Sequence, residues 1–584
     1  MADIGVIAVT AAGRAAAGRL VAAWPDEAEV VRAEPPAEAL RRAFTGSGAV
    51  VGFLAVGATV RVLAPLLGDK STDPPVVCVD ESLRFAVAVL GGHHGANELA
   101  HRVAAVLGCE PVVTTASDSV AGTPLDSYGA DLGFTVADPG PLARVGAALL
   151  SGEPVRLEGA GDWPLPALPD SADAATPAAD AAAVIAVTDR TDGPGTPDGP
   201  GHPLTLVYRP PSLVVGVGSA RGAPAEEVGG LVDAALADAG LAPASVRAVA
   251  TVDLKADEAG ILAAARDRGW DVVTRPAAEL AAVDVPNPSE VVRAEVGTPS
   301  VAEAAALRTA ADAGRAAELV VAKRKSANAT VAIARLRPRG RLAVVGLGPG
   351  ARDLTAPRAV AELGRASVVV GLDQYVDQVR DLLRPGTRVL DSGLGQEEER
   401  ARSAVCAART GAAVALIGSG DAGVYAMASP ALDFAGADID VVGVPGITAA
   451  AAAANLLGAP LGHDHAYVSL SDLHTPWEAI ERRVRAAAEG DFAVCFYNPR
   501  SRRRDWQLAR ALEILAEHRP PETPVGHVRN ASRDGERVRL TTLEDMLAGG
   551  VDEVDMFTVV LVGGSASRAV AGRFVTPRGY RWKG

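Results

Sequence analysis

Cysteine, lysine and aromatic side chains are scarce in this chain of 584 residues. The four cysteines lie far apart with no C-x-x-C pair, so neither a disulfide framework nor a thiolate zinc site is expected, and a reducing cytoplasm is the expected location. The 56 basic residues comprise five lysines and 51 arginines, which makes arginine a poor marker of function here. A net charge of −15 has the wrong sign for binding a phosphate backbone, so nucleic acid is not an expected partner.

Long apolar runs are also missing. Residues 49–68 form the most apolar early stretch, but Arg61 interrupts it, so neither a signal peptide nor a membrane span is predicted. The adjacent His93 and His94 could serve as metal ligands or acid/base groups, but neighbouring side chains commonly point apart, so no metal site is predicted. Hydrophobic residues still make up 48% of the chain, enough for about four domains of roughly 150 residues each.

Composition also indicates where the chain divides. Residues 159–203 are dominated by Ala, Asp, Pro and Gly, which predicts a weakly packed spacer, and the Arg/Pro/Gly segment 335–340 predicts a domain junction. Elsewhere, short β-rich runs alternate with helical stretches, which predicts α/β domains with open, mostly parallel sheets. The predicted divisions are residues 1–150, 151–212, 213–338 and 339–584.

Two glycine loops follow apolar runs in the last division. The first, Gly346-Leu-Gly-Pro-Gly350, precedes Thr355, which is predicted to cap the next helix. By itself this loop fits a tight βα turn or a dinucleotide fingerprint, although its G-x-G-x-G spacing and Pro349 count against the fingerprint. The second loop, Gly418-Ser-Gly-Asp-Ala-Gly423, follows another apolar run, and two such loops in one sheet predict one composite site.

Further motifs follow in a characteristic order: Val444-Pro-Gly-Ile-Thr-Ala449, Tyr467-Val-Ser-Leu-Ser471, Phe496-Tyr-Asn-Pro-Arg-Ser501 and Val528-Arg-Asn-Ala-Ser532. Together with the glycine loops they make residues 341–567 resemble the tetrapyrrole methyltransferase family, and most of all its precorrin-3B C17-methyltransferase branch. The resemblance implies a two-domain α/β fold that binds S-adenosylmethionine in the cleft between the domains. It also implies C17 methylation with ring contraction, and a homodimer formed through this half.

The resemblance carries site residues with it. The implied cofactor contacts are Gly348, Pro349, Gly418, Gly420, Asp421, Val424, Tyr425, Thr448, Ala449 and Leu470, and the implied substrate contacts include Leu347, Gly350 and Asn498. Asp421 is also a candidate for the proton transfer that ring contraction needs. Arg500, Arg502 and Arg503 form a basic cluster that either binds the acetate and propionate groups of a tetrapyrrole or lies solvated at the start of a helix.

The region before the junction carries a second set of motifs. Gly216-Val-Gly-Ser-Ala-Arg-Gly222 precedes a strand-like run that ends in Lys255, Asp257 and Glu258. Residues 45–135 and 213–335 resemble cobalt-precorrin-5A hydrolase, which opens a lactone and releases acetaldehyde. An ammonium and carboxylates in one crevice could supply the electrophile and the base for that hydrolysis. The alternatives are an ordinary exposed cluster and a non-catalytic module that binds the tetrapyrrole. The whole chain is thus expected to act twice on tetrapyrroles, free or chelating cobalt.

Overall fold

The structure, a computed structural model, describes residues 3–68, 72–92, 95–114, 124–192, 204–393, 395–502 and 504–579. His93, His94 and Arg503 lie outside these residues. The chain forms two compact units, one of Met1–Tyr128 with Leu142–Ser151 and the other of Gly129–Pro141 with Gly152–Gly584. No helix in the described ranges is both long and apolar enough to cross a bilayer.

The first unit is an α/β layer built on a six-stranded sheet of order β2-β1-β3-β4-β5-β6, in which only the β4–β5 pair is antiparallel. Its strands are β1 Ile4–Ala8, β2 Ala28–Val30, β3 Ala49–Phe53, β4 Val76–Val79, β5 Phe85–Leu90 and β6 Glu110–Val112. Its helices are α1 Ala11–Ala23, α2 Pro36–Gly46, α3 Val56–Leu63, α4 Ala96–Leu107 and α6 Leu142–Leu150. Every residue of the apolar strand β4 is buried, so the sheet forms the interior of this unit and the helices cover it.

The expected spacer is wrong for most of its length. Residues 155–158, 172–173, 183–187 and 204–209 form four strands of a five-stranded sheet of order β7-β11-β10-β8-β9. Its strands are β7 Thr135–Val136, β8 Val155–Glu158, β9 Ala172–Asp173, β10 Ala183–Val187 and β11 Leu204–Arg209. The five apolar residues of β10 are all buried, because β8 and β11 pair with β10 on either side. The surrounding Ala, Asp and Pro residues dominate the composition of this stretch, so composition alone did not indicate the strand. Residues 193–203 of the expected spacer lie outside the described residues.

The third sheet has the order β14-β13-β12-β16-β15, with β12, β13 and β14 parallel and the β15–β16 hairpin antiparallel. Its strands are β12 Leu213–Ser219, β13 Val246–Val252, β14 Asp271–Arg275, β15 Ala316–Lys325 and β16 Ala329–Arg337. Its helices are α7 Ala225–Asp238, α8 Ala259–Arg266, α9 Ala277–Ala281, α10 Glu290–Val296 and α11 Val301–Ala313. Gly216 lets α11 pack directly on β12, since a Cβ there would overlap the Ala302 carbonyl.

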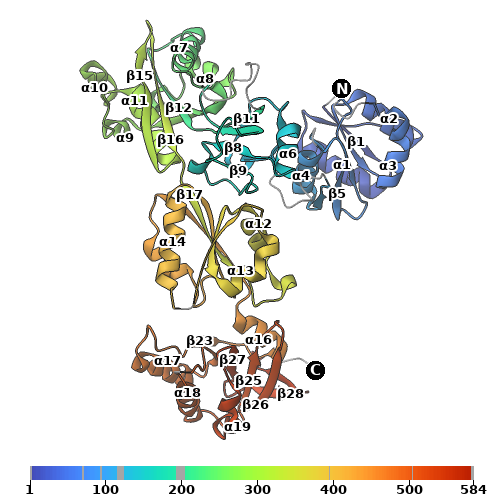
Figure 1. Cartoon of the computed structure of the whole chain (residues 1–584), viewed down its shortest axis with the longest axis vertical. Coiled ribbons are helices and arrows are strands. Elements are labelled where there is room, and N and C mark those ends of the chain that lie inside the picture. Colours follow the sequence, from blue (N-terminus) through green and yellow to red (C-terminus); the bar gives the residue numbers. More distant parts are fainter. Residues whose placement is uncertain are drawn as a thin grey trace. The chain divides into compact units, whose positions relative to one another are not determined.

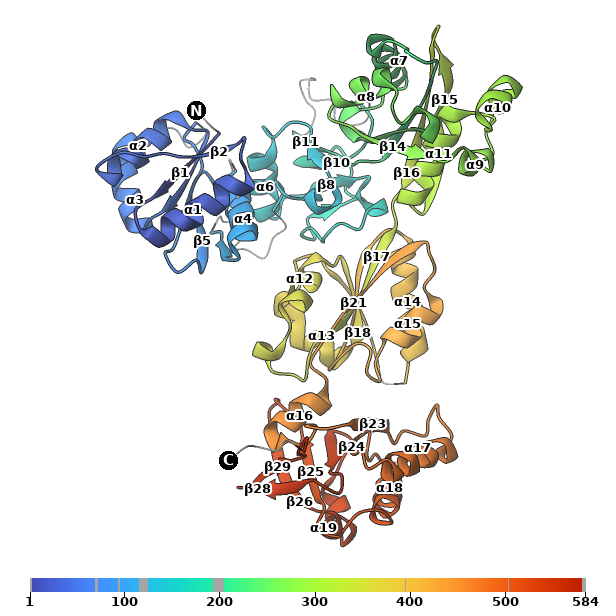
Figure 2. The same ribbon diagram turned by 180° about the vertical axis from the view of Figure 1, so that it is seen from behind.

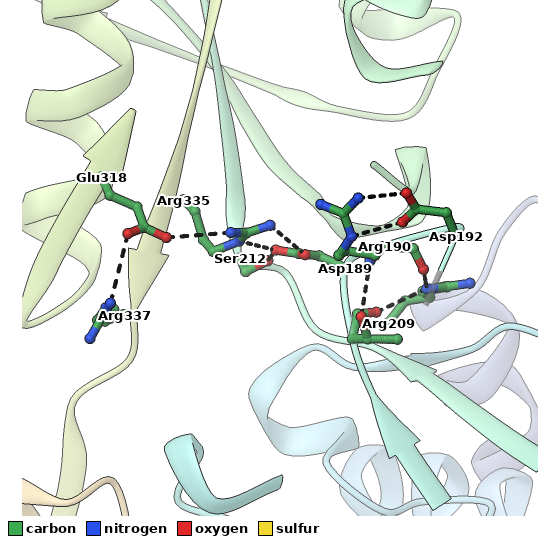
Figure 3. A network of polar contacts seen from close by, with 9 residues as sticks. Asp189, Arg190, Asp192, Arg209, Ser212, Glu318, Arg335 and Arg337 are labelled. Carbon is green, nitrogen blue, oxygen red and sulfur yellow. Dashed lines mark hydrogen bonds and ion pairs between the residues drawn. The ribbon is translucent and has the colours of Figure 1, made fainter. Parts of the chain in front are cut away.

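A buried ion pair joins this sheet to the one before it (Figure 3). The Asp189 carboxylate, after β10, accepts from Arg335 Nε at 2.6 Å, from Arg335 Nη2 at 2.8 Å and from Ser212 Oγ at 2.7 Å. Arg190 turns instead to the exposed Asp192. Because a bidentate guanidinium contact fixes both distance and orientation, Asp189 ties the two sheets together.

The fourth sheet is wholly parallel, with the order β19-β18-β20-β17-β21. Its strands are β17 Gly340–Gly346, β18 Val368–Leu372, β19 Arg388–Ser392, β20 Ala413–Gly418 and β21 Ile439–Val444. Helices α12 Pro357–Arg365 and α13 Asp373–Val379 cover one face, and α14 Glu397–Arg409 with α15 Ala428–Phe434 covers the other (Figures 1 and 2). Thr355 does not cap α12, because Pro357 opens that helix and Ala356 takes the cap position.

The last part of the chain has a mixed sheet of order β23-β24-β27-β25-β26, in which only β23 and β24 are parallel. Its strands are β23 His465–Ser469, β24 Ala493–Tyr497, β25 Pro524–Arg529, β26 Arg537–Thr542 and β27 Thr558–Val562. Its helices are α16 Ala449–Leu457, α17 Trp477–Glu489, α18 Gln507–Ala516 and α19 Leu543–Leu547. A small sheet of β22 Gly458–Ala459, β28 Arg568–Val570 and β29 Arg573–Val575 lies beside it. The predicted α/β class with mostly parallel sheets is confirmed.

Candidate functional site

The two glycine loops meet, as the sequence predicted. The Gly348 N–H donates to the Gly420 carbonyl at 3.0 Å, and the Gly420 N–H donates back to the Gly348 carbonyl at 2.8 Å. The Leu347 N–H adds a bond to the Gly418 carbonyl at 2.9 Å. Both loops leave the carboxyl ends of the adjacent parallel strands β17 and β20, which is where open α/β sheets bind ligands.

Asp421 braces the second loop against the Val444–Ala449 turn. Its Oδ1 accepts from the Gly423 N–H at 2.8 Å, and its Oδ2 accepts from the Gly446 N–H at 3.0 Å. Gly446 lies so close to the second loop that a Cβ there would overlap the Gly420 carbonyl oxygen. The carboxylate of this predicted catalytic residue therefore accepts backbone hydrogen bonds, and Gly446 is a site residue that the sequence analysis missed.

Three tyrosines form an aromatic group beside this turn. Tyr425, at a left-handed φ of 51°, donates its hydroxyl to the Tyr467 carbonyl at 2.8 Å and packs 5.2 Å from the Tyr497 ring. The Tyr497 hydroxyl contacts Thr448 Oγ1 and accepts from the Ala450 N–H at 3.0 Å. Burial raises the pKa of Tyr425 and of Tyr497, so both hydroxyls stay protonated at neutral pH. Tyr497 lies within the quoted Phe-Tyr-Asn-Pro motif, which was the signal that could have identified it.

Arg533 is a second residue that the sequence analysis missed. From the connection between β25 and β26, its Nε donates to the Pro349 carbonyl and its Nη2 donates to Ser419 Oγ at 2.6 Å. This one side chain therefore contacts both glycine loops. It directly follows the quoted Val528–Ser532 motif, so its position in the sequence gave a signal.

Other predicted residues lie in or beside the same region. Ala449 begins α16, and Val424 follows the second loop with its N–H donating to the Asp421 carbonyl at 3.3 Å. Leu347 and Leu470 are buried in cores at 4% and 0% exposure. Their side chains therefore pack inward, and any ligand contact falls to their backbone atoms.

The predicted arginine cluster is divided by its contacts. Arg500 donates to Asp552 Oδ1 at 2.9 Å and to the Val551 carbonyl at 2.7 Å, so its charge is already paired. Arg502 is exposed, and Arg503 lies outside the described residues. Asn498 holds a left-handed φ of 49° and donates from Nδ2 to Ser469 Oγ at 3.1 Å.

Space for a ligand lies beside the second loop. A Cβ built on Gly418 would meet nothing within 4 Å, and one built on Gly420 would come no closer than 3.7 Å to Thr448. Close approach to backbone in such open space is what a glycine loop provides. The residues present therefore fit the S-adenosylmethionine that the resemblance implies.

A second candidate site lies at the carboxyl ends of β12 and β13. Glu258 is 3% exposed and accepts from the Gly222 N–H at 2.7 Å and from Lys255 Nζ at 3.3 Å. Arg221 pairs with the exposed Asp257 at 2.7 Å, and this hydrogen bond lowers the pKa of Asp257 below its usual value. The structure thus brings the predicted cluster and the glycine turn together, and it adds Arg221.

No three His, Cys, Asp or Glu side chains gather as a metal-binding group in the part of the chain that the structure describes. The absence of a metal site stays a prediction.

Comparison with known proteins identifies both regions. The Tetrapyrrole (Corrin/Porphyrin) Methylases family matches residues 341–547. A Salmonella typhimurium protein named "Probable cobalt-factor III C(17)-methyltransferase" is 45% identical over 242 residues, which are 41% of this chain and 99% of that protein. The chain belongs to the tetrapyrrole methylase family. Ahead of this methylase, Cobalamin synthesis G N-terminal matches residues 38–118 and Cobalamin synthesis G C-terminus matches residues 213–334.

Other relatives of the methylase are longer than the matched part. The "Cobalt-factor III methyltransferase" of Priestia megaterium is 42% identical over 254 residues, which are 42% of this chain. The chain spans 46% of that protein's length. The crystal structure of the methyltransferase CobJ is 40% identical and covers 41% of this chain and 100% of its own, with a TM-score of 0.39.

Proposed function

We propose that this chain is a bifunctional enzyme of cobalamin (corrin ring) biosynthesis. Residues 339–584 methylate C17 of precorrin-3B, or of its cobalt form, with contraction of the ring. Residues 1–338 hydrolyse the lactone of cobalt-precorrin-5A and release acetaldehyde. The proposal is carried by one observation, the presence of both cobalamin synthesis G matches and a methyltransferase match in a single chain.

Alignment supplies most of the catalysis in the methyltransferase half. S-adenosylmethionine, when bound, supplies an electrophilic sulfonium methyl group, and a conjugated tetrapyrrole carbon is already electron-rich. The interlocked loops at Gly348 and Gly420 would hold the cofactor through backbone groups, and Asp421 would keep the second loop against its neighbouring turn. Holding two reactants at near-attack distance replaces activation by an acid or base in the transfer step.

The tetrapyrrole would lie against the first loop and the Asn498 turn. Gly350 is the partly exposed end of that loop, whereas Leu347 packs beneath it. Arg502 and Arg503 would bind peripheral carboxylates. Arg500 would contribute least to this binding, because Asp552 already pairs with its guanidinium.

Lactone opening would use the cluster at the ends of β12 and β13. The reaction needs an activated water, a stabilised oxyanion and a proton for the departing alkoxide. Asp257 would accept the proton from water as an ionised carboxylate, and the hydrogen bond from Arg221, which lowers the pKa of Asp257, makes that carboxylate a weak base. The ammonium of Lys255, held by the buried Glu258, would stabilise the developing negative charge.

The hydrolase assignment is tested by trapping acetaldehyde from cobalt-precorrin-5A with the full chain. We expect the wild type to release acetaldehyde and Lys255→Ala to release it about tenfold more slowly or slower still. Lys325→Ala, which removes an exposed lysine of β15, should release it at the wild-type rate. A wild-type chain that binds the tetrapyrrole yet releases no acetaldehyde would instead support a non-catalytic binding module.

A further inference from the structure

Arg533 is held at the tip of a turn with an unusual backbone. Asn530 and Ser532 both adopt left-handed conformations, with φ of 50° and 57°. The Arg533 N–H donates to the Asn530 carbonyl at 2.9 Å, and the Ser532 N–H donates to Glu536 Oε2 at 2.6 Å. Asn530 Nδ2 also donates to the Asp534 carbonyl at 3.1 Å. Two non-glycine residues in the left-handed region persist only where surrounding contacts fix them, so this turn aims the arginine in one direction.

The arginine reaches the point where the two glycine loops join. Its guanidinium donates to the Pro349 carbonyl in the first loop and to Ser419 Oγ in the second. Gly350 makes this approach possible, because a Cβ at that position would overlap the Arg533 side chain. A residue of the last sheet's β25–β26 connection therefore sets the spacing of two loops that belong to another sheet.

The charge of this guanidinium is not neutralised by the described part of the chain. Both of its contacts are neutral oxygens, and no described carboxylate lies within ion-pair distance of it. Arg529, in the strand just before the turn, pairs with Asp555 at 2.8 Å, and Arg500 pairs with Asp552 at 2.9 Å. A guanidinium has five N–H donors, and these two contacts use two of them. Arg533 thus presents a half-buried cation with donors to spare beside the first glycine loop.

We propose that Arg533 receives a peripheral carboxylate of the tetrapyrrole while it holds the two glycine loops in register. This inference rests on the methyltransferase function proposed above and assigns a positioning residue to it. A substrate carboxylate would neutralise the positive charge of the Arg533 guanidinium. A charge-assisted hydrogen bond there is stronger than one between neutral groups. Because the same side chain touches the cofactor-facing loop, tetrapyrrole binding and cofactor binding become coupled through Arg533.

The test is direct binding to the full chain, with uroporphyrin III and its methyl ester as matched ligands that do or do not carry carboxylates. We expect Arg533→Gln to weaken uroporphyrin binding by about tenfold to a hundredfold. The ester should lose little affinity, so the preference for the free acid should shrink. Arg533→Lys should restore part of the preference through its charge, and Arg537→Gln, an exposed arginine of β26, serves as the control.

Isothermal titration with S-adenosylmethionine supplies the second readout. Uroporphyrin should tighten cofactor binding in the wild type and should lose that effect in Arg533→Gln. Equal uroporphyrin affinity in wild type and Arg533→Gln would overturn this inference alone. A wild type that binds S-adenosylmethionine but no tetrapyrrole would overturn the proposed methyltransferase function together with it.

Discussion

Gly348 and Gly420 exchange two backbone hydrogen bonds, at 3.0 Å and 2.8 Å, although 72 positions separate them in the chain (420 − 348). This pairing turns two glycine loops from neighbouring strands into one surface. A substitution in either loop therefore affects both loops. Its effect on ligand binding can be measured separately from its effect on folding only where the added side-chain atoms meet no other protein atoms.

Gly418 is such a position. A Cβ there meets nothing within 4 Å, so Gly418→Ala should leave the melting temperature unchanged. If S-adenosylmethionine occupies that space, its affinity should fall by about tenfold or more, as measured by isothermal titration. Gly443→Ala on the edge strand β21, which also meets nothing within 4 Å, should keep both properties. Unchanged affinity in Gly418→Ala would place the cofactor elsewhere.

The variant Asp421→Asn distinguishes two roles of Asp421, holding the second glycine loop against the Val444–Ala449 turn and transferring a proton. The amide keeps one acceptor oxygen, so either Gly423 or Gly446 loses its hydrogen bond, at a cost of about 1 kcal/mol or more. We expect the melting temperature and the affinity for S-adenosylmethionine to fall together. A lower kcat with both of those properties unchanged would instead assign Asp421 to proton transfer.

The arginine cluster is tested by steady-state kinetics of Arg500→Gln/Arg502→Gln/Arg503→Gln against the double variant that retains Arg500. Each desolvated charge-assisted contact is worth on the order of 1.5–3 kcal/mol, so both variants should show a strongly raised tetrapyrrole KM with little change for S-adenosylmethionine. The double variant should account for most of the rise, because Asp552 already pairs with Arg500. Arg482→Gln, which changes an exposed arginine, is the control and should leave the tetrapyrrole KM unchanged. An unchanged tetrapyrrole KM in the cluster variants as well would assign these arginines to the solvated surface.

Asp189 should be a stability determinant of the region before the junction. Asp189→Asn removes the charge that receives two bonds from Arg335 and leaves polar atoms poorly paired in a buried place, at a cost of about 1–3 kcal/mol. Its melting transition should shift to lower temperature. Asp192→Asn, which breaks an exposed pair with Arg190, should not shift it. Equal effects of the two variants would contradict this role.

Local patterns in the sequence predicted much of this fold. The alternation of β-rich runs with helical stretches predicted the α/β class, and the glycine loops met as expected because they follow adjacent parallel strands. Strand β10 was missed because its five apolar residues lie inside an Ala-, Asp- and Pro-rich stretch. Their strand conformation depends on pairing with β8 and β11, which the local sequence does not indicate. Composition describes a segment on average, whereas burial depends on its partners.

The candidate site shows the same limit. The motif positions could be found in the sequence, but the pairing of Arg500 with Asp552 depends on a contact 52 residues away. Arg533 lies 184 residues from Pro349, so its place after the Val528–Ser532 motif marks it as a candidate but does not reveal that it contacts the first glycine loop. Long-range contacts decide which charges are neutralised, and local sequence patterns do not encode them.

The most direct test of the account is methyl transfer by the full chain from isotopically labelled S-adenosylmethionine to cobalt-factor III, followed by mass spectrometry of the tetrapyrrole. We predict a product carrying one labelled methyl group at C17, formed by the wild type and largely lost in Gly418→Ala. A tetrapyrrole recovered without label, from protein that binds S-adenosylmethionine, would contradict it.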